Sequence, residues 1–563
     1  MFETVSDLSR RNFLKGVALG TAGLAGAGLI AGCSPQDGMP SVGVAPDGSA
    51  KTASAESGIP SFFDAPEPIG DDKIAETLDA DVLVIGAGIA GATTASSCVE
   101  NGLKVVLVEK LENPRAIGLD YGLVNPSILA EKGVEPEDVY GLARDHMEKS
   151  CHMCRGDKVY RFMSRSGEAG DWYIEKAKGY GFEPQVMAYA SNSDHYRNNR
   201  GVIELWHKGI DLGEEENCYA PMEEMLANLS QEVVSAGGEY RNNTEAVQLL
   251  QSENGEVVGA ICKSGDRYIK INASRGVVLA AGDYAMDAEM LSYYTEWDFD
   301  SYDPEFCSNY STGTGDGHKM GLWAGAKMQE APHPLMIFMG YAYGYLRVNK
   351  NGERYVNEDS GYVGGVNSQL QQPGAASWAI WDNKWSKEIP ASLAYGGGMS
   401  WDQDFRRIED PWTAEGEETG AWSWERESGL LLEADSLDGL ADAIGFEGEA
   451  KETFLATVER YNALVDEGDS EFGKRPELMT KIAEPPFYAL KMVVEVAVST
   501  AGLITNADSE CLDEGGKPIP GLYAVGNNAG GLFGIDYNEV TVPGISIGRA
   551  VTFGYLLGQH LAK

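Results

Sequence analysis

Three glycines, Gly86, Gly88 and Gly91, directly follow the apolar run 81–85. Glycines at this spacing permit a tight turn and let the backbone approach a pyrophosphate, whose charge the amino end of the next helix stabilises. Glu109 lies 18 residues after Gly91, where its carboxylate can accept hydrogen bonds from ribose hydroxyls. Together, the strand, glycines, helix and acid predict a dinucleotide-binding site.

Elements from both ends of the chain must position this site. Apolar runs predict buried parallel strands over 81–85 and 104–108, with a small-residue helix over 92–101 between them. Residues 521–527 have the pattern of a strand that runs into a glycine turn, and a final helix is expected over 543–560. The amino end of that helix can face the flavin edge that is negative in the reduced state. This end of the chain therefore favours FAD over NAD.

The composition argues against several classes of protein. The 563 residues include 44 Lys and Arg against 86 Asp and Glu, so the formal net charge is −42. A nucleic-acid backbone needs basic side chains, so this acidity argues against a nucleic-acid partner. Eight cysteines are too few for a disulfide scaffold, and 43% apolar with 23% charged residues is typical of a globular protein.

The first 33 residues have the form of an export signal. Arg10 and Arg11 stand in a twin-arginine pattern, a weakly apolar stretch follows, and residues 30–33 (IAGC) resemble a lipoprotein cleavage box. We expect export by the twin-arginine route, cleavage before Cys33 and lipidation of its sulfur, which would anchor the protein outside the cytoplasm. Cleavage without lipidation, or a short helix with a chance arginine pair, are the alternatives. The Ser-, Pro- and Gly-rich residues 34–77 predict a flexible tether.

Further motifs carry a resemblance to a known superfamily. They are 276–282 (GVVLAAG), 351–358 (NGERYVNE), 485–488 (PPFY) and the stretch 518–562. With the glycine motif, they make residues 78–563 similar to the FAD-dependent fumarate reductase and 3-ketosteroid dehydrogenase superfamily. The resemblance implies an α/β fold, in which a Rossmann-like FAD-binding domain is built from both chain ends and an α+β substrate-capping domain is inserted.

The same resemblance implies domain limits and cofactor contacts. It assigns 78–284 and 491–563 to the FAD-binding domain and 285–490 to the capping domain. The residues expected to bind FAD are Gly86, Gly88, Ala90, Gly91, Glu109, Lys110, Ala246, Gly282, Asn527, Ser546 and Ile547.

Two loops match the superfamily less clearly. A flavin-contacting turn rich in Gly and Ser is expected after Lys110, whereas residues 111–125 read LENPRAIGLDYGLVN, so the flavin contacts of this loop stay open. The glycine-rich stretch 311–317 lacks the preceding strand of a phosphate loop. The resemblance places it near the flavin and the domain junction, and a plain loop is the alternative.

Three ligand positions separate the branches of the superfamily. A fumarate reductase holds two carboxylates with arginines and a histidine, because buried charges need partners. At the corresponding positions this chain has Tyr362, Tyr537 and Val498. The missing cations argue against a small dianion as the substrate.

The two tyrosines instead match the ketosteroid dehydrogenase branch. The resemblance implies hydride transfer between flavin N5 and the C=C bond of an enone, which places charge on the carbonyl oxygen. Tyr537 and the backbone N–H of Gly544 would form an oxyanion hole for that oxygen, and Tyr362 would supply the proton. We therefore expect an FAD-dependent reductase of enones or related steroid-like or aromatic unsaturated molecules.

Several alternatives stay open at this level. No second nucleotide motif follows a strand, so a separate cytochrome or quinol-linked protein is expected to donate electrons, as in anaerobic respiration. The same tyrosines permit a 3-ketosteroid dehydrogenase that works in the oxidising direction. Arg347, Arg354, Arg406 and Arg407 keep a urocanate- or fumarate-type reductase possible. A lipoprotein that only relays electrons would keep the FAD site and lose the acid.

No metal site is predicted. The sequence Cys151-His152-Met153-Cys154 lacks the histidine that haem c attachment needs directly after the second cysteine. An iron–sulfur cluster, a redox pair and inert thiols are the three interpretations of Cys151 and Cys154.

Overall fold

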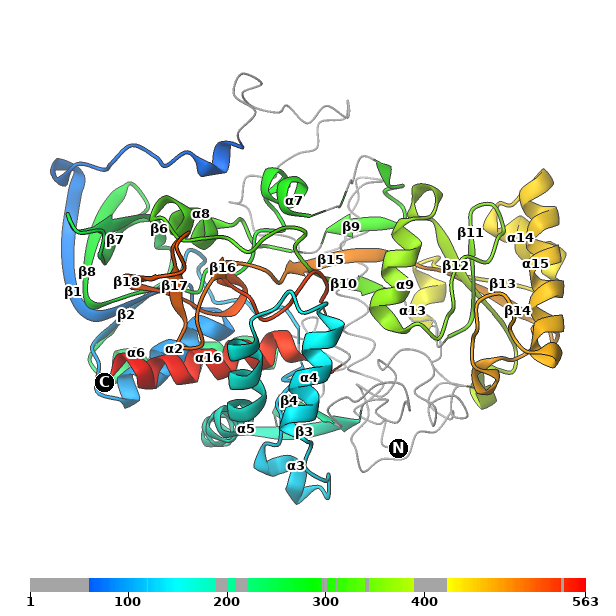
Figure 1. Cartoon of the computed structure of the whole chain (residues 1–563), viewed down its shortest axis with the longest axis horizontal. Coiled ribbons are helices and arrows are strands. Elements are labelled where there is room, and N and C mark those ends of the chain that lie inside the picture. Colours follow the sequence, from blue (N-terminus) through cyan, green and yellow to red (C-terminus); the bar gives the residue numbers. More distant parts are fainter. Residues whose placement is uncertain are drawn as a thin grey trace.

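The computed structural model describes residues 60–118, 120–188, 201–207, 220–295, 297, 301–309, 311–339, 344–388, 423–537 and 541–563. The predicted signal with Cys33, and the tether up to residue 59, lie outside this part of the chain. Figure 1 shows an elongated molecule with one sheet at each end and a small sheet between them.

The larger sheet has the order β17-β18-β8-β1-β2-β5 and is mostly parallel. Its strands are β1 (Ile74–Ile85), β2 (Val105–Val108), β5 (Glu239–Arg241), β8 (Arg267–Leu279), β17 (Glu510–Leu512) and β18 (Pro518–Ala524). Val82, Leu83 and Val84 are fully buried, because Val82 and Val84 pack in one apolar cluster with Ala95 and Phe553, and Leu83 packs in another with Ala260 and Cys262. β18 comes from the far end of the chain and pairs with β8. The α/β fold class predicted from the sequence is confirmed.

A small antiparallel meander extends this sheet. It consists of β6 (Glu245–Gln251), β7 (Val257–Ser264) and the first half of β8, and β8 pairs with β1 on its other edge from Tyr268 to Leu279. The alternation of polar and apolar residues around Asn254-Gly255 predicts this hairpin.

The helices α2 (Ile89–Glu100) and α16 (Ile545–Leu561) pack closely beneath the sheet (Figure 1). A Cβ atom at Gly558 would lie 2.3 Å from Ser97 Oγ, and one at Gly554 would lie 2.9 Å from Ala90 O. Small residues therefore set the distance between the two helices. Other helices of this region are α3 (Ser127–Glu131), α4 (Val139–Lys149), α5 (Gly156–Gly179), α6 (Ala220–Ser235), α7 (Ala288–Tyr294) and α8 (Asp316–Trp323).

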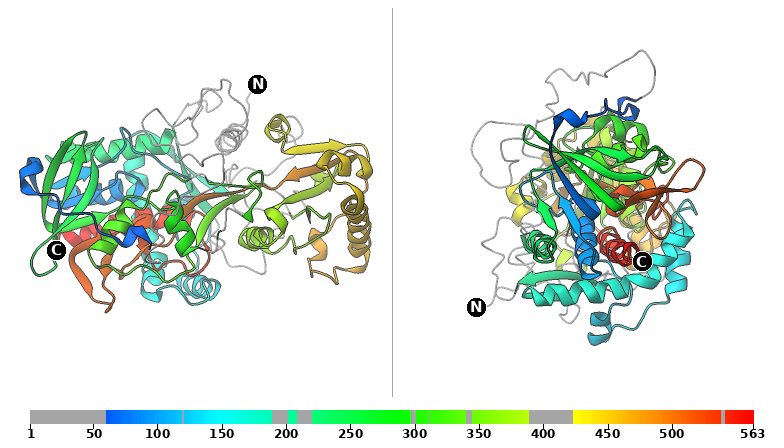
Figure 2. Two further views of the ribbon diagram at one scale, coloured as in Figure 1. Left: turned by 90° about the horizontal axis from the view of Figure 1, so that it is seen from above. Right: turned by 90° about the vertical axis from the view of Figure 1, so that its left-hand side faces the viewer.

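The second sheet is antiparallel, with the order β11-β12-β14-β13, and lies at the opposite end of the molecule (Figure 2). Its elements are β11 (Leu346–Asn349), α9 (Gly361–Leu370), β12 (Ser377–Asp382), α13 (Ser423–Glu427), β13 (Leu431–Ala434), α14 (Leu437–Ile444), α15 (Gly448–Glu467) and β14 (Phe487–Lys491). All of them lie within the predicted insertion 285–490, apart from the last residue of β14. The limits of the domains themselves stay a prediction.

Strands β10 (Leu335–Met339), β15 (Val494–Ser499) and β9 (Cys307–Asn309) form a sheet between these two ends (Figure 1). Two small pairs complete the strands, β3 (Phe182–Ala188) with β4 (Gly201–His207) and β16 (Leu503–Ile504) with β19 (Ala529–Gly530). Within the described residues, no helix is long and apolar enough to cross a membrane.

Residues 60–77 correct the predicted tether. Phe62 is only 4% exposed and lies against Tyr294, with ring centroids 5.6 Å apart. Trp323 Nε1 donates to Phe62 O at 3.0 Å, and β1 already begins at Ile74. The prediction of a tether is therefore wrong for this segment, because Phe62 packs on the domain despite a composition rich in Pro and Asp.

Candidate cofactor and substrate site

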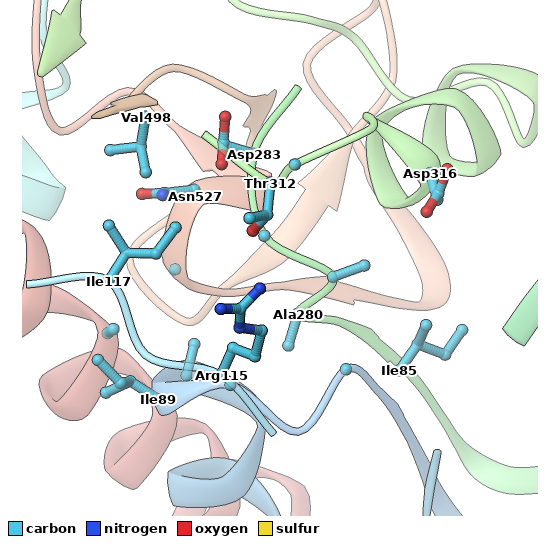
Figure 3. A pocket seen from close by; sticks show the side chains of 18 of the residues that line it. Ile85, Ile89, Arg115, Ile117, Ala280, Asp283, Thr312, Asp316, Val498 and Asn527 are labelled. Atoms are coloured by element: carbon cyan, nitrogen blue, oxygen red, sulfur yellow. The ribbon is translucent and has the colours of Figure 1, made fainter. Parts of the chain in front are cut away.

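A deep cavity opens at the carboxyl ends of β1, β2 and β8 (Figure 3). It offers about 250 Å³ of water-accessible space and runs from Ile85 and Glu109 to Tyr537 and the amino end of α16. Ligands of parallel α/β sheets bind at this edge, because loops and helix amino ends converge there. The predicted residues Gly86, Gly88, Ala90, Glu109, Lys110, Ala246, Gly282, Asn527, Ser546, Ile547, Tyr537 and Gly544 all line it.

The glycine motif forms the turn between β1 and α2. Gly86 has φ of +100°, which a larger residue adopts only with strain. Gly91 does not line the cavity but supports this turn, since a Cβ there would lie 1.8 Å from Gly86 O. The free amino end of α2 therefore faces the cavity, where it can bind an anion.

Glu109 directly follows β2 and is 8% exposed. Its Oε2 accepts from Ala87 N at 2.8 Å and its Oε1 accepts from Leu111 N at 2.9 Å. Each oxygen keeps a lone pair that can accept a hydrogen bond from a ribose hydroxyl. Beside it, Lys110 Nζ forms an ion pair with Asp316 Oδ2 at 2.9 Å, so Lys110 fixes the start of α8.

The loop after Lys110 contributes residues that the sequence left open. Arg115, Ile117, Gly118 and Asp120 line the cavity. Arg115 extends its guanidinium into the cavity (Figure 3), and no described residue forms a hydrogen bond or an ion pair with it. Its backbone oxygen is the nearest atom to a Cβ built on Gly88, at 3.9 Å. Because a guanidinium binds phosphate oxygens in two-pronged fashion, Arg115 is suited to a pyrophosphate at the α2 turn.

Changing Arg115→Gln is expected to raise the dissociation constant for FAD by about 10- to 100-fold, since a charge-assisted hydrogen bond contributes about 1.5–3 kcal/mol. Titration calorimetry on the apoprotein measures this. The affinity for riboflavin, which has no phosphate, should stay unchanged, and Arg115→Lys should recover part of the loss. An equal loss for FAD and riboflavin would contradict the assignment. Arg165→Gln, an exposed partner of Glu168, is the matched control.

The stretch 311–317 also contributes to the wall, through Thr312, Gly313 and Asp316. It follows β9 and leads into α8. Buried Asp283 holds it in place, accepting from Ser311 Oγ at 2.9 Å, from Ala285 N at 2.7 Å and from Ser499 N at 3.2 Å. Burial raises the pKa of Asp283. This carboxyl links three segments of the cavity wall, and no sequence motif marks it.

Tyr537 lies where α16 begins. The side chain is 4% exposed, and its ring meets Phe533 edge-on at 5.0 Å. Ser546 N donates to Tyr537 Oη at a long 3.4 Å, so the first turn of α16 directs an N–H at the phenol oxygen. Gly544 caps the helix in a left-handed conformation, with φ of +72°. The N–H that reaches the phenol oxygen is that of Ser546, whereas the role predicted for the Gly544 N–H, a hydrogen bond to the substrate oxygen, stays a prediction.

Tyr362 is the second residue of α9, and its side chain lies outside the described part. The helix is nevertheless tied to the Tyr537 segment, because Asn367 Nδ2 donates to Asp536 Oδ2 at 3.3 Å. Burial raises the pKa of Asp536 to about 6. The structure therefore places α9, which carries Tyr362, beside the segment that carries Tyr537.

Apolar side chains also line part of the cavity. Val498 on β15 pairs directly with Met336 on β10, and both line the cavity with Ala497 and Met320. Among the described residues, the only lining cations are Lys110 and Arg115. This end therefore offers a phenol and helix N–H groups instead of the charges that a small dicarboxylate needs.

The arginines that left a dicarboxylate substrate possible are paired or buried away from the cavity, or lie outside the described residues. Arg354 Nη2 forms ion pairs with Glu358 at 2.8 Å and with Asp469 at 2.9 Å, away from solvent. Arg347 is buried on β11, and Arg406 and Arg407 lie outside the described residues. These contacts anchor the segment that leads into α9.

Cys151 is exposed and Cys154 is partly buried, and both are free thiols. Within the described residues, no group of three or more His, Cys, Asp or Glu side chains is arranged to hold a metal ion.

The chain matches a known protein family over most of its length. Residues 81–538 match the family described as FAD binding domain. A probable fumarate reductase from Shewanella frigidimarina is 26% identical over 506 residues, which cover 86% of this chain and 74% of the relative. A digoxin reductase from Eggerthella lenta is 27% identical over 593 residues, which cover 99% of this chain and 97% of the relative.

A solved structure shares the fold. The 3-ketosteroid Δ1-dehydrogenase from Sterolibacterium denitrificans has a TM-score of 0.63 at 19% identity, and the match covers 86% of this chain and 99% of that chain. The glycine turn, Glu109, the unpaired Arg115 and the two helix amino ends fit the pyrophosphate, ribose and ring of a flavin dinucleotide. The chain therefore belongs to the FAD binding domain family, and it is an FAD-dependent oxidoreductase.

Proposed function

We propose that the protein is an exported FAD-dependent reductase that saturates the C=C bond of a neutral enone or a related steroid-like or aromatic molecule. The observation that carries the proposal is Tyr537, a buried phenol at the amino end of α16, in a cavity whose only described lining cations are Lys110 and Arg115. The names of two relatives, a fumarate reductase and a digoxin reductase, support reduction of an unsaturated bond as the reaction class.

In this proposal, the chain's own residues polarise the substrate and supply a proton. Bound FAD supplies the hydride. Tyr537 donates a hydrogen bond to the substrate carbonyl, where negative charge develops, while Ser546 N–H stabilises the phenol oxygen in turn. Tyr362 delivers a proton to the neighbouring carbon. The apolar side chains of Val498 and Met336 exclude water and accommodate a hydrophobic ring.

Paired acceptors test the substrate class. The FAD of the purified protein is reduced with dithionite without oxygen, and its reoxidation is followed at the flavin absorption band. Dimethyl fumarate and benzalacetone are neutral analogues of the anions fumarate and cinnamate. We expect the neutral member of each pair to react faster, because no free cation lines the Tyr537 end of the described cavity. Faster reaction with fumarate than with its diester would overturn the proposal.

The direction of the reaction needs its own experiment. A dehydrogenase would reduce its oxidised FAD when given a saturated 3-ketosteroid. We expect no bleaching of the flavin with that steroid and rapid reoxidation of reduced FAD with the matching Δ4-3-ketosteroid. The opposite pattern would favour the oxidising alternative. If no acceptor reoxidises the FAD but a cytochrome does, the protein is an electron relay.

We also infer that the protein is lipid-anchored outside the cytoplasm and receives electrons from a separate cytochrome or quinol-linked protein. Arg10, Arg11 and the sequence before Cys33 support export and lipidation. In a host with a twin-arginine system, Cys33→Ser should move the full-length protein from the membrane fraction to the soluble fraction. An unchanged distribution would contradict the anchor.

A further inference from the structure

Arg549 is a buried cation that lies behind the cavity wall. The residue is on the second turn of α16 and is 2% exposed. Its Nη1 donates to Thr500 O at 3.0 Å, its Nη2 donates to Asn527 Oδ1 at 2.5 Å, and its guanidinium lies 4.8 Å from the centre of the Phe533 ring. Its Nε has no hydrogen-bond partner among the described residues. In the described part of the chain, no carboxylate is within ion-pair distance.

The buried side chain near Arg549 is a second base, Lys158, and so it does not supply a negative charge to pair with the guanidinium. Lys158 Nζ on α5 donates to Thr505 Oγ1 at 2.6 Å and to Gly530 O at 2.7 Å. It is 2% exposed and likewise forms no ion pair with a described residue. Burying a cation without an anion costs several kcal/mol, and a Met or Leu would fill the same space without that cost. The arrangement therefore suggests that a bound group supplies the missing negative charge.

Burial lowers the pKa of Arg549 to about 10, and that of Lys158 to about 7. At neutral pH the guanidinium therefore stays protonated, whereas the Lys158 amine is only partly protonated. Arg549 is therefore the permanent charge of the two.

Asn527 connects Arg549 to the cavity. A guanidinium only donates hydrogen bonds, so the atom of the Asn527 amide that faces Arg549 must be Oδ1. The backbone oxygen of Asn527 accepts from His318 Nε2 at 3.0 Å, which fixes the residue from the other side. Asn527 lines the cavity (Figure 3), and its Nδ2 is left as a hydrogen-bond donor. Arg549 thereby determines which end of the Asn527 amide faces the cavity.

We propose that Arg549 is a positioning residue that orients Asn527 Nδ2 toward the flavin and, with its buried charge, stabilises the negative charge that the ring of FAD gains on reduction. The inference concerns the redox balance of the bound cofactor. It does not depend on which substrate the protein reduces.

The midpoint potential of bound FAD tests this, because it reports how much more tightly the protein binds reduced than oxidised FAD. Arg549→Met is expected to weaken the binding of reduced FAD relative to oxidised FAD at least tenfold, which lowers the two-electron potential by about 30 mV. Equilibration with reference dyes in the absence of substrate measures the shift. Arg161→Met removes the same charge from a half-exposed pair with Asp508 and should leave the potential unchanged.

If Arg549→Met no longer binds FAD, a second variant tests the same proposal. Asn527→Asp places a carboxylate against the guanidinium, so the buried charge gains a partner and the donor is removed. We expect the same direction of shift, again at least tenfold in relative affinity. A change below twofold for Asn527→Asp, relative to Arg161→Met, would overturn the proposal. Failure of the acceptor experiments would leave this measurement unaffected.

Discussion

Replacing Tyr537 by phenylalanine is expected to lower the turnover of a neutral enone by about 10²- to 10³-fold, the typical effect of removing one oxyanion donor. The ring would keep its packing on Phe533, 5.0 Å away, and only the phenol oxygen would be lost. FAD content should therefore remain that of the wild type. Turnover at saturating acceptor, together with the flavin-to-protein absorbance ratio, measures the two effects separately.

A tyrosine on the same helix provides the control. Tyr555 lies on α16 but points to Glu168, which its Oη meets at 3.2 Å, and it does not line the cavity. Tyr555→Phe should leave turnover unchanged. If Tyr537→Phe retains full turnover of the enone, the oxyanion role is wrong, and another donor must polarise the carbonyl.

The second large effect is a loss of stability and of FAD in mild acid. Three buried histidines support the segment from Asn527 to Tyr537. His146 Nε2 contacts Leu532 O at 2.9 Å, His318 Nε2 contacts Asn527 O at 3.0 Å, and His333 Nε2 contacts Gln329 O at 2.7 Å. Gln329 in turn donates to Phe533 O at 3.2 Å and to Gly534 O at 3.1 Å. Neutral imidazoles donate to these oxygens through Nε2.

Protonation would add a second donor to each ring. Asn528 Nδ2, itself a donor, faces His318 Nδ1 at 3.1 Å, and among the described residues His146 Nδ1 has no partner, so neither of these rings has an acceptor for the new N–H. Tyr284 Oη faces His333 Nδ1 at 2.7 Å, so the hydroxyl would have to change from donor to acceptor. Burial accordingly lowers the pKa of each of these histidines to about 4. In the unfolded chain they would protonate near pH 6.5.

The sign of the effect follows from proton binding. Between pH 6.5 and 4 the unfolded chain binds more protons than the folded chain, so stability falls as the pH falls. Each imidazole lowers the free energy of unfolding by about 1.4 kcal/mol per pH unit in this window, or by about 2 kcal/mol from pH 6.5 to pH 5. The three together would remove about 6 kcal/mol, which is comparable with the whole stability of a typical domain.

Denaturant unfolding and FAD release from pH 7.5 to 5 measure this loss. His146→Gln keeps a donor for Leu532 O without a group that titrates, and it should reduce the acid loss by about a third. His560→Gln, at the partly exposed end of α16, is the control and should leave the profile unchanged. Stability that does not change between pH 6.5 and 5 would contradict the argument.

Local patterns predicted much of the FAD domain. The runs before Gly86 and Glu109 predict β1 and β2, because a buried parallel strand must be apolar on both faces. The helix expected over 92–101 corresponds to α2, which begins three residues earlier, at Ile89. The helix expected over 543–560 corresponds to α16. The predicted tether was wrong over 60–77, since composition does not reveal that Phe62 has a partner at Tyr294.

The sequence by itself determined the cofactor class and the candidate phenol, because glycine spacing, strand ends and Tyr537 are features of short continuous segments. Only the tertiary structure decided the surroundings of these residues. Arg115 enters the cavity, Arg354 is already paired with Glu358 and Asp469, and Arg549 lies buried against Asn527. Whether a cation is free, paired or buried depends on segments that meet across the fold, and for Arg354 and Asp469 these lie more than 100 residues apart. That information is long-range, so no local pattern contains it.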